Sequence, residues 1–260
     1  MSRSQFLTIF PSFEDLKTIQ QTLPTILEEV QRNDAALIVH DSSVRQREEI
    51  WQWLQDFNQG RYFLVLTDQL SMASARNMCL QLGLERFIPE YVCMLEDDHG
   101  FRPGMIPKLV EAMQRYYGKP CPNGLRYGLF TGCRKCWSHV PFITTPEGFA
   151  YPDPNTPWWV LGGANSCMRC APAGHWQAVL KGYDPDEYMI SNYQTRHLNF
   201  RNYSNGFTTM VVEDGTLILT VDRVGRGYTQ TAELRGWDEE YTASDHRSRF
   251  RGKLGPQANS

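Results

Sequence analysis

Residues 91–100 read Tyr-Val-Cys-Met-Leu-Glu-Asp-Asp-His-Gly, an apolar run followed directly by three consecutive acids. The apolar residues up to Leu95 are typical of a buried strand. The carboxylates of Glu96, Asp97 and Asp98 are costly to bury unless a cation or strong hydrogen-bond donors compensate them. Hard oxygen ligands of this kind suit Mg²⁺ or Mn²⁺, which in proteins commonly carry phosphates. A solvated acidic turn is the alternative interpretation.

Three further apolar runs with strand character precede this one, and amphipathic helical patterns separate them. The strand candidates are 6–10, 35–40 and 62–66, and the helical patterns are 13–32, with a weak interruption at Pro24, 44–57 and 71–84. This alternation predicts an α/β fold with a largely parallel central sheet. Ligands of such sheets bind beyond the carboxyl ends of the strands. Asp41, Ser42 and Ser43 follow one strand and the acids at 96–98 follow another, so both clusters are expected on one edge.

The second half of the chain has a different pattern. We expect a helix over 107–117, a strand over 127–132, a long loop over 141–157, a short helix over 173–180 and one more strand pair after Val211. An irregular, arginine-rich tail follows. The sequence has no sharp linker, which favours one continuous domain.

Composition limits the classes of partner. The 260 residues carry a formal net charge of -3, and the pI is near 6.1, which argues against nucleic acid as the main partner. No apolar run approaches the roughly 20 residues that cross a bilayer. The first residues lack a signal-peptide core, and seven cysteines, an odd number, fit a reducing compartment. We therefore expect a cytoplasmic protein without a membrane span.

The motifs, taken in order, resemble the GT-A fold nucleotide-sugar glycosyltransferases, especially the large inverting family that includes cellulose and chitin synthases. The strand ending in Asp41-Ser42-Ser43 is similar to a family strand ending in Asp-Asp-Gly-Ser. Residues 71–77, Ser-Met-Ala-Ser-Ala-Arg-Asn, resemble the family's Gly-x-x-x-Ala-Arg-Asn helix start. Glu96-Asp97-Asp98 stands where the family has Asp-x-Asp, and Gly162-Gly163 matches a later segment. The resemblance covers about residues 5–215.

The resemblance implies a GT-A fold in which a Rossmann-like nucleotide-binding half, with a mostly parallel central sheet, continues into a smaller acceptor-binding half. We place a single domain over residues 1–260. About 1–100 would bind the nucleotide sugar, about 101–215 would bind the acceptor and carry the catalytic base, and about 216–260 would form a C-terminal extension.

The donor side follows from the same resemblance. Asp98 would bind Mn²⁺ or Mg²⁺, with Glu96 or Asp97 nearby. Glu96 replaces the family's first Asp, and its longer side chain could instead bind the ribose or a metal-bound water. Asp41 and Ser43 would contact the nucleotide, with Asp41 accepting a hydrogen bond from the base, and Pro11 would shape the same pocket.

Arg76 suits a diphosphate because its guanidinium is a planar fork that is always charged. A salt bridge on the helix surface is the alternative role for Arg76. In the family a C-terminal His is a further metal ligand, and His246 is the corresponding candidate. A basic tail without such a role is the alternative there.

The catalytic base of the family is an acid after the Gly-Gly segment, and it removes the proton of the acceptor hydroxyl. The match favours Glu187 or Asp186, with Asp184 third. Acids that only stabilise a helix N-terminus are the alternative. Trp158 and Trp159 would stack on a sugar or belong to the core.

Two Cys-x-x-Cys pairs, Cys133/Cys136 and Cys167/Cys170, could form a structural Zn²⁺ site. Buried free thiols are the simpler interpretation, because the loop between the pairs is long.

The function implied is metal-dependent transfer of a sugar from a nucleotide-diphosphate donor, a UDP-sugar first, to a saccharide or other hydroxyl-bearing acceptor, with inversion. The residues themselves do not decide between inversion and retention. A sugar nucleotidyltransferase of similar fold and a non-catalytic nucleotide- or sugar-binding module are the other candidates. The nucleotidyltransferase generally requires a Gly-rich, lysine-bearing loop after the first strand, which Phe10-Pro11-Ser12-Phe13 does not provide.

Overall fold

The first strand, β1 (Phe6–Ser12), is buried along its whole length and lies in the parallel part of a mixed sheet. It pairs in parallel with β2 (Ala36–Asp41) on one side and with β4 (Tyr91–Leu95) on the other, and β2 pairs in parallel with β3 (Phe63–Leu66). The nearly continuous apolar sequences of β1, β2 and β4 are typical of strands that are covered on both faces. The predicted parallel half of the sheet is therefore confirmed.

The computed structural model describes residues 4–68, 72–122, 124–132, 141–146, 148–153, 155–156, 168–183, 191–212 and 218–220. Its other strands are β5 (His99–Phe101), β6 (Arg126–Thr131), β7 (Phe142–Thr144), β8 (Ala150–Pro152), β9 (Met168–Pro172), β10 (Phe207–Val211) and β11 (Ile218–Thr220). Its helices are α1 (Leu16–Arg32), α2 (Arg47–Asn58), α3 (Met72–Phe87), α4 (Met105–Tyr116), α6 (Ala173–His175), the π-helical turn η2 (Trp176–Leu180) and α7 (Ser191–Ser204). Nine strands form one sheet in the order β3-β2-β1-β4-β9-β6-β10-β8-β7, and β11 pairs with β5.

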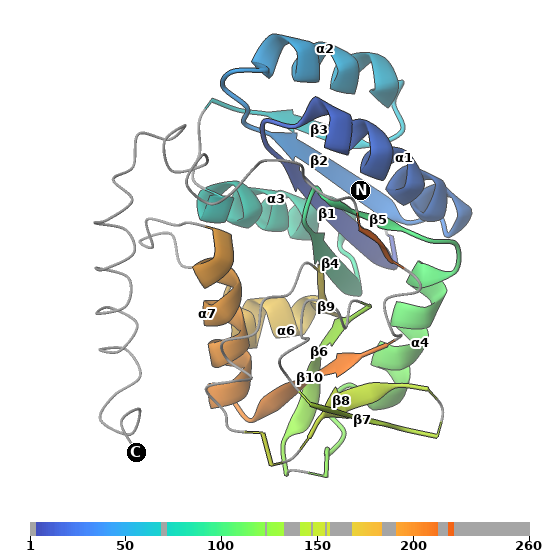
Figure 1. Ribbon diagram of the computed structural model, residues 1–260, viewed down its shortest axis with the longest axis vertical. Coiled ribbons are helices and arrows are strands. Elements are labelled where there is room, and N and C mark those ends of the chain that lie inside the picture. Colours follow the sequence, from blue (N-terminus) through green and yellow to red (C-terminus); the bar gives the residue numbers. More distant parts are fainter. Residues whose placement is uncertain are drawn as a thin grey trace.

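Helices cover both faces of the sheet, giving three layers (Figure 1). On one face the strands contribute Phe6, Phe10, Leu37, Val39, Cys93 and Leu95 to a core shared with α1, α2 and α4. On the other face they contribute Leu7, Ile9, Ile38, Val92 and Met94 to a core shared with α3, α6, η2 and α7. The alternation follows from the two-residue period of a strand. This is the α/β arrangement that the sequence predicts.

The helices begin and end close to their predicted limits. α1 begins after Asp15, whose side chain accepts a hydrogen bond from the backbone N–H of Thr18 at 3.1 Å. Pro24 lies inside α1 without ending it, so the weak interruption expected there is not observed. The buried side chains of Leu23, Ile26 and Leu27 hold the helix on the sheet around the proline.

One expectation for the second half was wrong. The long loop predicted over 141–157 contains a hairpin, in which β7 and β8 pair antiparallel and Ala150 of β8 pairs with Val211 of β10. Its strands have three residues each, too short for a pattern of alternating hydrophobicity to show. Among the described residues after Val211 lies one strand, β11, which pairs with β5; the rest of the segment in which a strand pair is expected lies outside the described residues.

Within the described part of the chain, no helix combines the length and apolarity needed to span a membrane. The nine-stranded sheet contains strands from both predicted halves, and the division at about residue 100 stays a prediction.

Candidate functional site

The two polar clusters predicted from sequence lie on one edge of the sheet. Ser12 at the end of β1 is the register partner of Asp41 at the end of β2, and Glu96 directly follows β4. The strand order runs from β1 outward to β2 and β3 and then returns to β4 on the other side of β1. This reversal is the topological switch point at which open α/β sheets bind ligands.

Asp41 is fully buried and surrounded by protein donors. Its Oδ1 accepts hydrogen bonds from the backbone N–H of Ser43 and from Nε1 of Trp51, both at 2.9 Å. Its Oδ2 accepts from the hydroxyls of Ser12 and Ser43, both at 2.8 Å. Burial raises the pKa of Asp41 above its usual value, and these hydrogen bonds counteract part of that shift. In this arrangement Asp41 fixes the loop after β2, together with Ser43 and beside the buried Pro11.

The same loop is held by Glu14, a residue that sequence reasoning missed. Glu14 has a left-handed φ of 57°, which is uncommon for a residue with a side chain, and it is only 1% exposed. Its carboxylate accepts hydrogen bonds from the backbone N–H groups of Val44, Arg45 and Gln46, just before α2. A buried negative charge at this helix terminus is favourable because it meets unpaired N–H groups and the helix dipole.

Glu96 lies between two buried guanidinium groups. Its Oε1 is 3.5 Å from Nη2 of Arg76, which comes from α3, and 3.7 Å from Nη2 of Arg169, which comes from β9. Both arginines are 1% exposed, whereas the Glu96 side chain is 29% exposed. Arg76 is therefore not the surface salt-bridge residue that the sequence left as an alternative. Replacing buried ion pairs by apolar residues is often neutral or stabilising, so two buried arginines here favour a binding role.

Tyr183 joins this cluster from the loop after η2. Nη1 of Arg169 donates to the Tyr183 hydroxyl at 3.0 Å. The guanidinium carbon of Arg76 lies 5.1 Å from the centre of the Tyr183 ring, close enough for a cation–π interaction. The side-chain amide of Asn77, the residue after Arg76, exchanges two hydrogen bonds with the backbone of Tyr183.

Asp97 and Asp98 point to different neighbours. Oδ2 of Asp97 accepts from the backbone N–H of Phe13 at 3.1 Å, so this acid ties the end of β1 to the segment after β4. The Asp98 side chain is 24% exposed, and its Oδ1 lies 2.5 Å from Nδ1 of His99. The described residues contain no group of three or more His, Cys, Asp or Glu that could enclose a metal ion. One partly exposed carboxylate still fits Mg²⁺ or Mn²⁺, because such ions keep several waters and take further oxygens from substrate phosphates.

Several predicted site residues lie outside the described part of the chain. These are the base candidates Asp184, Asp186 and Glu187, the metal candidate His246, the aromatic pair Trp158 and Trp159, the Gly162-Gly163 segment, and the cysteines Cys133, Cys136 and Cys167. Cys170 is described, and it is a buried free thiol like Cys79, Cys93 and Cys121. Burial raises the pKa of Cys170 well above its usual value, so at neutral pH it is an inert thiol.

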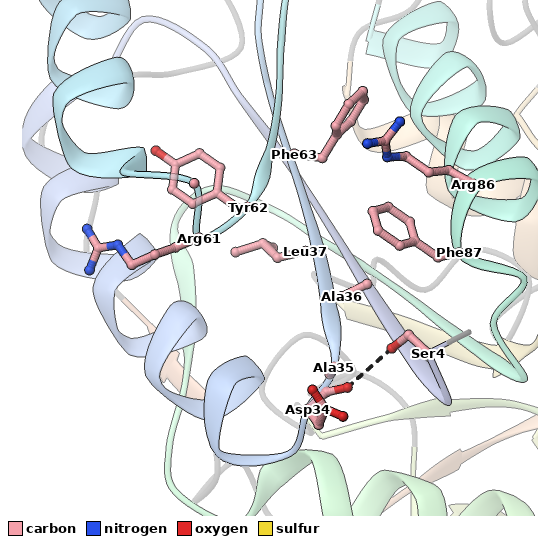
Figure 2. Close-up of a pocket in the computed structure, with 11 residues that line it drawn as sticks. Ser4, Asp34, Ala35, Ala36, Leu37, Arg61, Tyr62, Phe63, Arg86 and Phe87 are labelled. Atoms are coloured by element: carbon pink, nitrogen blue, oxygen red, sulfur yellow. Dashed lines mark hydrogen bonds between the residues drawn. The ribbon is translucent and has the colours of Figure 1, made fainter. Parts of the chain in front are cut away.

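A cavity of about 370 Å³ lies at the opposite, amino-terminal edge of β2 and β3 (Figure 2). Figure 2 shows its two cationic side chains, Arg61 and Arg86, on opposite sides of β2. Each guanidinium is packed over a ring of the protein itself: Arg61 lies 4.4 Å from the centre of the Phe57 ring, and Arg86 lies 4.5 Å from that of Phe63. The cavity shares no residue with the cluster around Glu96, so the candidate site remains at the carboxyl-terminal edge.

Some residues of the site could have been recognised from the sequence as functional candidates, and others could not. Arg169 is a charged residue within an apolar, strand-like segment, which is a signal for a functional or paired side chain that could have been used. Asn77 stands in the same Ala-Arg-Asn motif as Arg76. Tyr183 and Glu14 carry no such signal, because their contacts are to residues far away in the chain.

Several solved structures have a fold similar to that of this chain. The mannosyltransferase PcManGT from Pyrobaculum calidifontis, solved with GDP-Man and Mn²⁺, is 17% identical, with a TM-score of 0.56 over 90% of this chain and 61% of that one. TarS 1–349 from S. aureus with UDP-GlcNAc is 11% identical, with a TM-score of 0.57 over 86% and 60%. GalNAc-T7 with UDP, GalNAc and Mn²⁺ is 10% identical, with a TM-score of 0.58 over 89% and 48%. This chain thus spans about half to three fifths of their lengths.

No curated protein sequence matches the chain significantly. A family model does match: the one described as glycosyl transferase family 2 covers residues 8–140, from within β1 to beyond the end of β6, and therefore Asp41, Arg76 and the acids at 96–98. The match extends over half of the chain and agrees with the fold of the structural neighbours. The chain belongs to glycosyl transferase family 2.

Proposed function

We propose that the chain transfers a sugar from a nucleotide-diphosphate sugar to a hydroxyl group of an acceptor, in a reaction that requires Mn²⁺ or Mg²⁺. The observation that carries this proposal is that Arg76 and Arg169 both lie against Glu96 at the carboxyl-terminal edge of the sheet, two residues before the partly exposed Asp98. Two fixed guanidinium groups and one partly exposed carboxylate match the needs of a diphosphate with a divalent cation. Membership of glycosyl transferase family 2 supports the same reaction class.

On the donor side, Arg76 and Arg169 would bind the diphosphate oxygens, and Glu96 would hold both guanidiniums in place. Because Glu96 lies against two arginines, holding their guanidinium groups is the first role that we assign to it. Binding the metal or the ribose is its second candidate role. Asp98 would hold the divalent ion, with His246 as a further ligand. When bound, the ion offsets the negative charge that develops on the leaving diphosphate.

The nucleoside would lie beside Pro11 and the loop after β2. In this structure both oxygens of Asp41 already accept hydrogen bonds from the protein, and Ser43 donates one of them. A direct hydrogen bond between Asp41 and a nucleobase would therefore require one of these hydrogen bonds to break. Uridine is the first base to test because the family resemblance implies it, and structural neighbours hold both UDP-GlcNAc and GDP-Man.

On the acceptor side, Glu187 or Asp186 would remove the proton of the acceptor hydroxyl while its oxygen attacks the anomeric carbon. The bond from that carbon to the diphosphate breaks on the opposite side, so the configuration inverts. Tyr183 directly precedes this acidic segment in the sequence and lies against both donor-side arginines. This position supports the proximity of the base candidates to the donor.

A thermal-shift screen of nucleoside diphosphates and nucleotide sugars, each with Mn²⁺, Mg²⁺ or EDTA, tests the donor side. A ligand at 100 times its dissociation constant stabilises the folded protein by about 2.7 kcal/mol, which raises the melting temperature visibly. We expect one nucleotide to give a shift that disappears with EDTA. Absence of any shift would contradict the transferase proposal. Release of pyrophosphate from a nucleoside triphosphate and a sugar phosphate would instead indicate a nucleotidyltransferase.

A further inference from the structure

The side chain of Arg47, the first residue of α2, is fixed by three contacts. Its Nε donates to the carbonyl oxygen of Ser43 at 2.9 Å, and its Nη1 donates to Oδ1 of Asp68 at 3.0 Å. Its guanidinium carbon lies 5.0 Å from the centre of the Trp51 ring, whose Nε1 in turn donates to Asp41. Ion pairs at a surface generally hold no single geometry and add little stability, whereas this one is part of the network around Asp41.

The Arg47–Asp68 pair lies across the carboxyl ends of β2 and β3. Asp68 comes two residues after β3, and the backbone N–H of Thr67 donates to the carbonyl oxygen of Asp41 at 3.1 Å. Neighbouring strands are about 4.8 Å apart, so the ends of β2 and β3 lie roughly 10–15 Å from the end of β4, where Glu96 and its arginines are. A ribose joins a nucleobase to its diphosphate across a gap of this order. The pair is therefore within reach of the base of a donor whose diphosphate lies at those arginines.

Asp41 and Asp68 differ in their capacity to accept a further hydrogen bond. A carboxylate has about four lone-pair sites, and in Asp41 each oxygen already accepts two hydrogen bonds from the protein. The Asp68 side chain is 93% exposed, and within the described part of the chain its Oδ2 accepts no hydrogen bond. Arg47, whose side chain is 32% exposed, uses two of its five N–H donors in the contacts described above. The pair thus offers an acceptor to solvent beside further donors.

An acceptor beside a donor is complementary to one class of nucleobase. Uracil and guanine have a lactam edge, on which a ring N–H lies next to a carbonyl oxygen. A carboxylate accepts from that N–H, and a guanidinium donates to that oxygen. Cytosine and adenine present the opposite pattern, an amino group next to an unprotonated ring nitrogen. Against those two bases, the carboxylate would face a lone pair and the guanidinium would face another donor.

We infer that Arg47 and Asp68 are the residues that select the base of the donor nucleotide, and that they select uracil or guanine over cytosine and adenine. Asp68 accepts from the ring N–H and Arg47 donates to the neighbouring carbonyl oxygen, while Asp41 holds the loop on which Arg47 is mounted. The inference rests on the proposed transferase function and adds the class of base to it.

Two substitutions change the donor and acceptor pattern without a large change of shape. Asp68→Asn replaces the carboxylate by an amide, which can both accept and donate and so complements cytosine or adenine as well. Its affinity for the preferred nucleoside diphosphate should fall about tenfold, the effect of one lost hydrogen bond to a charged group, while its affinity for CDP and ADP should not fall. Arg47→Lys keeps the charge but loses the planar fork, and should also weaken binding of the preferred nucleotide about tenfold.

Glu28→Gln is the matched control. It makes the same chemical change in another exposed ion pair, that of Glu28 with Arg32 near the C-terminal end of α1. Because α1 begins at the carboxyl-terminal edge of the sheet and leads back to the start of β2, this pair lies at the opposite edge. Glu28→Gln should bind every nucleotide as the unmodified protein does.

The measurement is calorimetric titration of the four proteins with UDP, GDP, CDP, ADP and inorganic pyrophosphate, each with Mn²⁺. We expect the unmodified protein to bind UDP or GDP at least about tenfold more tightly than CDP and ADP, and Asp68→Asn to lose that preference. Pyrophosphate has no base, so its affinity should be the same in all four proteins. Equal binding of the four nucleotides by the unmodified protein, or an Asp68→Asn variant that keeps the preference or loses pyrophosphate affinity as well, overturns the inference but not the proposed function. A protein that binds neither pyrophosphate nor any nucleotide overturns both.

Discussion

Ser12 and Asp41 are register partners at the carboxyl ends of β1 and β2, and the Ser12 hydroxyl donates to Oδ2 of Asp41 at 2.8 Å. The same hydroxyl lies 3.0 Å from the carbonyl oxygen of His40, so it bridges two neighbouring residues of β2. The network around Asp41 thus joins the ends of two central strands to the loop that leads into α2. The edge of the sheet that binds ligands in this type of fold is held together by a buried carboxylate.

Asp41→Asn and Asp41→Ala should lose different amounts of unfolding free energy, because two N–H groups of the protein donate to Asp41. Asp41→Asn keeps an acceptor for the N–H groups of Ser43 and Trp51, and its amide can donate to the hydroxyls of Ser12 and Ser43 after these rotate. Asp41→Ala leaves two buried N–H groups without an acceptor, each at a cost of about 1–3 kcal/mol. We expect Asp41→Ala to lose about 3 kcal/mol of unfolding free energy and Asp41→Asn less than half of that.

Urea unfolding at neutral pH measures both values. Burial raises the pKa of Asp41, so its contribution to stability is greatest below the unfolded-state value of 3.8 and is lost as the pH rises through the folded-state value. Asn is neutral and lacks this pH dependence, which adds to the reasons why it should be tolerated. Equal losses in the two variants would contradict the hydrogen-bond assignment.

Asp98 predicts the metal dependence of nucleotide binding. Asp98→Asn should weaken binding of a nucleoside diphosphate about tenfold or more when Mn²⁺ is present, and should change little with EDTA, because only the ion-mediated part is lost. Titration calorimetry with and without Mn²⁺ makes this comparison. Asp56→Asn, on the exposed side of α2, is the matched control, since Asp56 contacts only Gln52 among the described hydrogen bonds. Unchanged affinity of Asp98→Asn with Mn²⁺ would refute the metal assignment.

Substitution of the catalytic base should lower kcat without changing donor affinity. Glu187→Gln and Asp186→Asn, made separately, should leave donor affinity unchanged, because the base acts on the acceptor hydroxyl. One of the two should lose at least about a hundredfold in kcat, within the range that general base catalysis contributes. Initial rates at saturating donor and acceptor provide the test. If both variants keep full activity, the base is a different residue.

Gly83→Ala should destabilise the fold, because the glycine packs closely against the sheet. A Cβ on Gly83 would lie 2.3 Å from Cδ2 of Leu7 and 3.2 Å from Cδ1 of Ile38, at the contact of α3 with the sheet. Overpacking a core typically costs about 1–3 kcal/mol, more than the ~1 kcal/mol that Ala gains over Gly in a helix. Gly83→Ala should therefore lower the free energy of unfolding by about 1 kcal/mol. Gly174→Ala, where no atom lies within 4 Å of the added Cβ, should not lower it.

His175 predicts a pH dependence of stability. Burial lowers its pKa below the usual 6.5, and the hydrogen bond between Nε2 and Oδ1 of Asn202 at 2.9 Å offsets part of that shift. Because its folded-state pKa is depressed, its contribution to stability is present above pH 6.5 and is lost as the pH falls through the folded-state value.

The unfolding free energy of the unmodified protein should therefore decrease relative to that of His175→Gln below pH 6.5, by at most about 1.4 kcal/mol per pH unit. Urea unfolding at pH 7.5, 6.5 and 5.5 for both proteins provides the comparison. Parallel curves for the two proteins would show that His175 titrates alike in the folded and unfolded states.

Much of the first half of the chain could be predicted from sequence because its signals are local. The apolar runs that became β1, β2 and β4 are long enough to identify, and the polar residues after them fall on one edge whenever such strands are parallel. The hairpin of β7 and β8 could not be predicted in this way, because three-residue strands carry too little pattern. Their formation depends on a neighbour, β10, some 60 residues further along the chain.

The sequence by itself determined the order of the elements up to β4, the parallel pairing of their strands and the positions of Asp41 and the acids at 96–98 at the strand ends, since each follows from hydrophobic periodicity and strand polarity. Arg76 was indicated by the family resemblance of residues 71–77. Only the tertiary structure decided what these side chains contact. Asp41 is enclosed by protein donors, Glu96 lies against two arginines, and Tyr183 joins Arg169 to Asn77. The physical reason is that hydrogen bonds and ion pairs act over a few ångströms between residues distant in sequence, and only the packed fold brings them within that range.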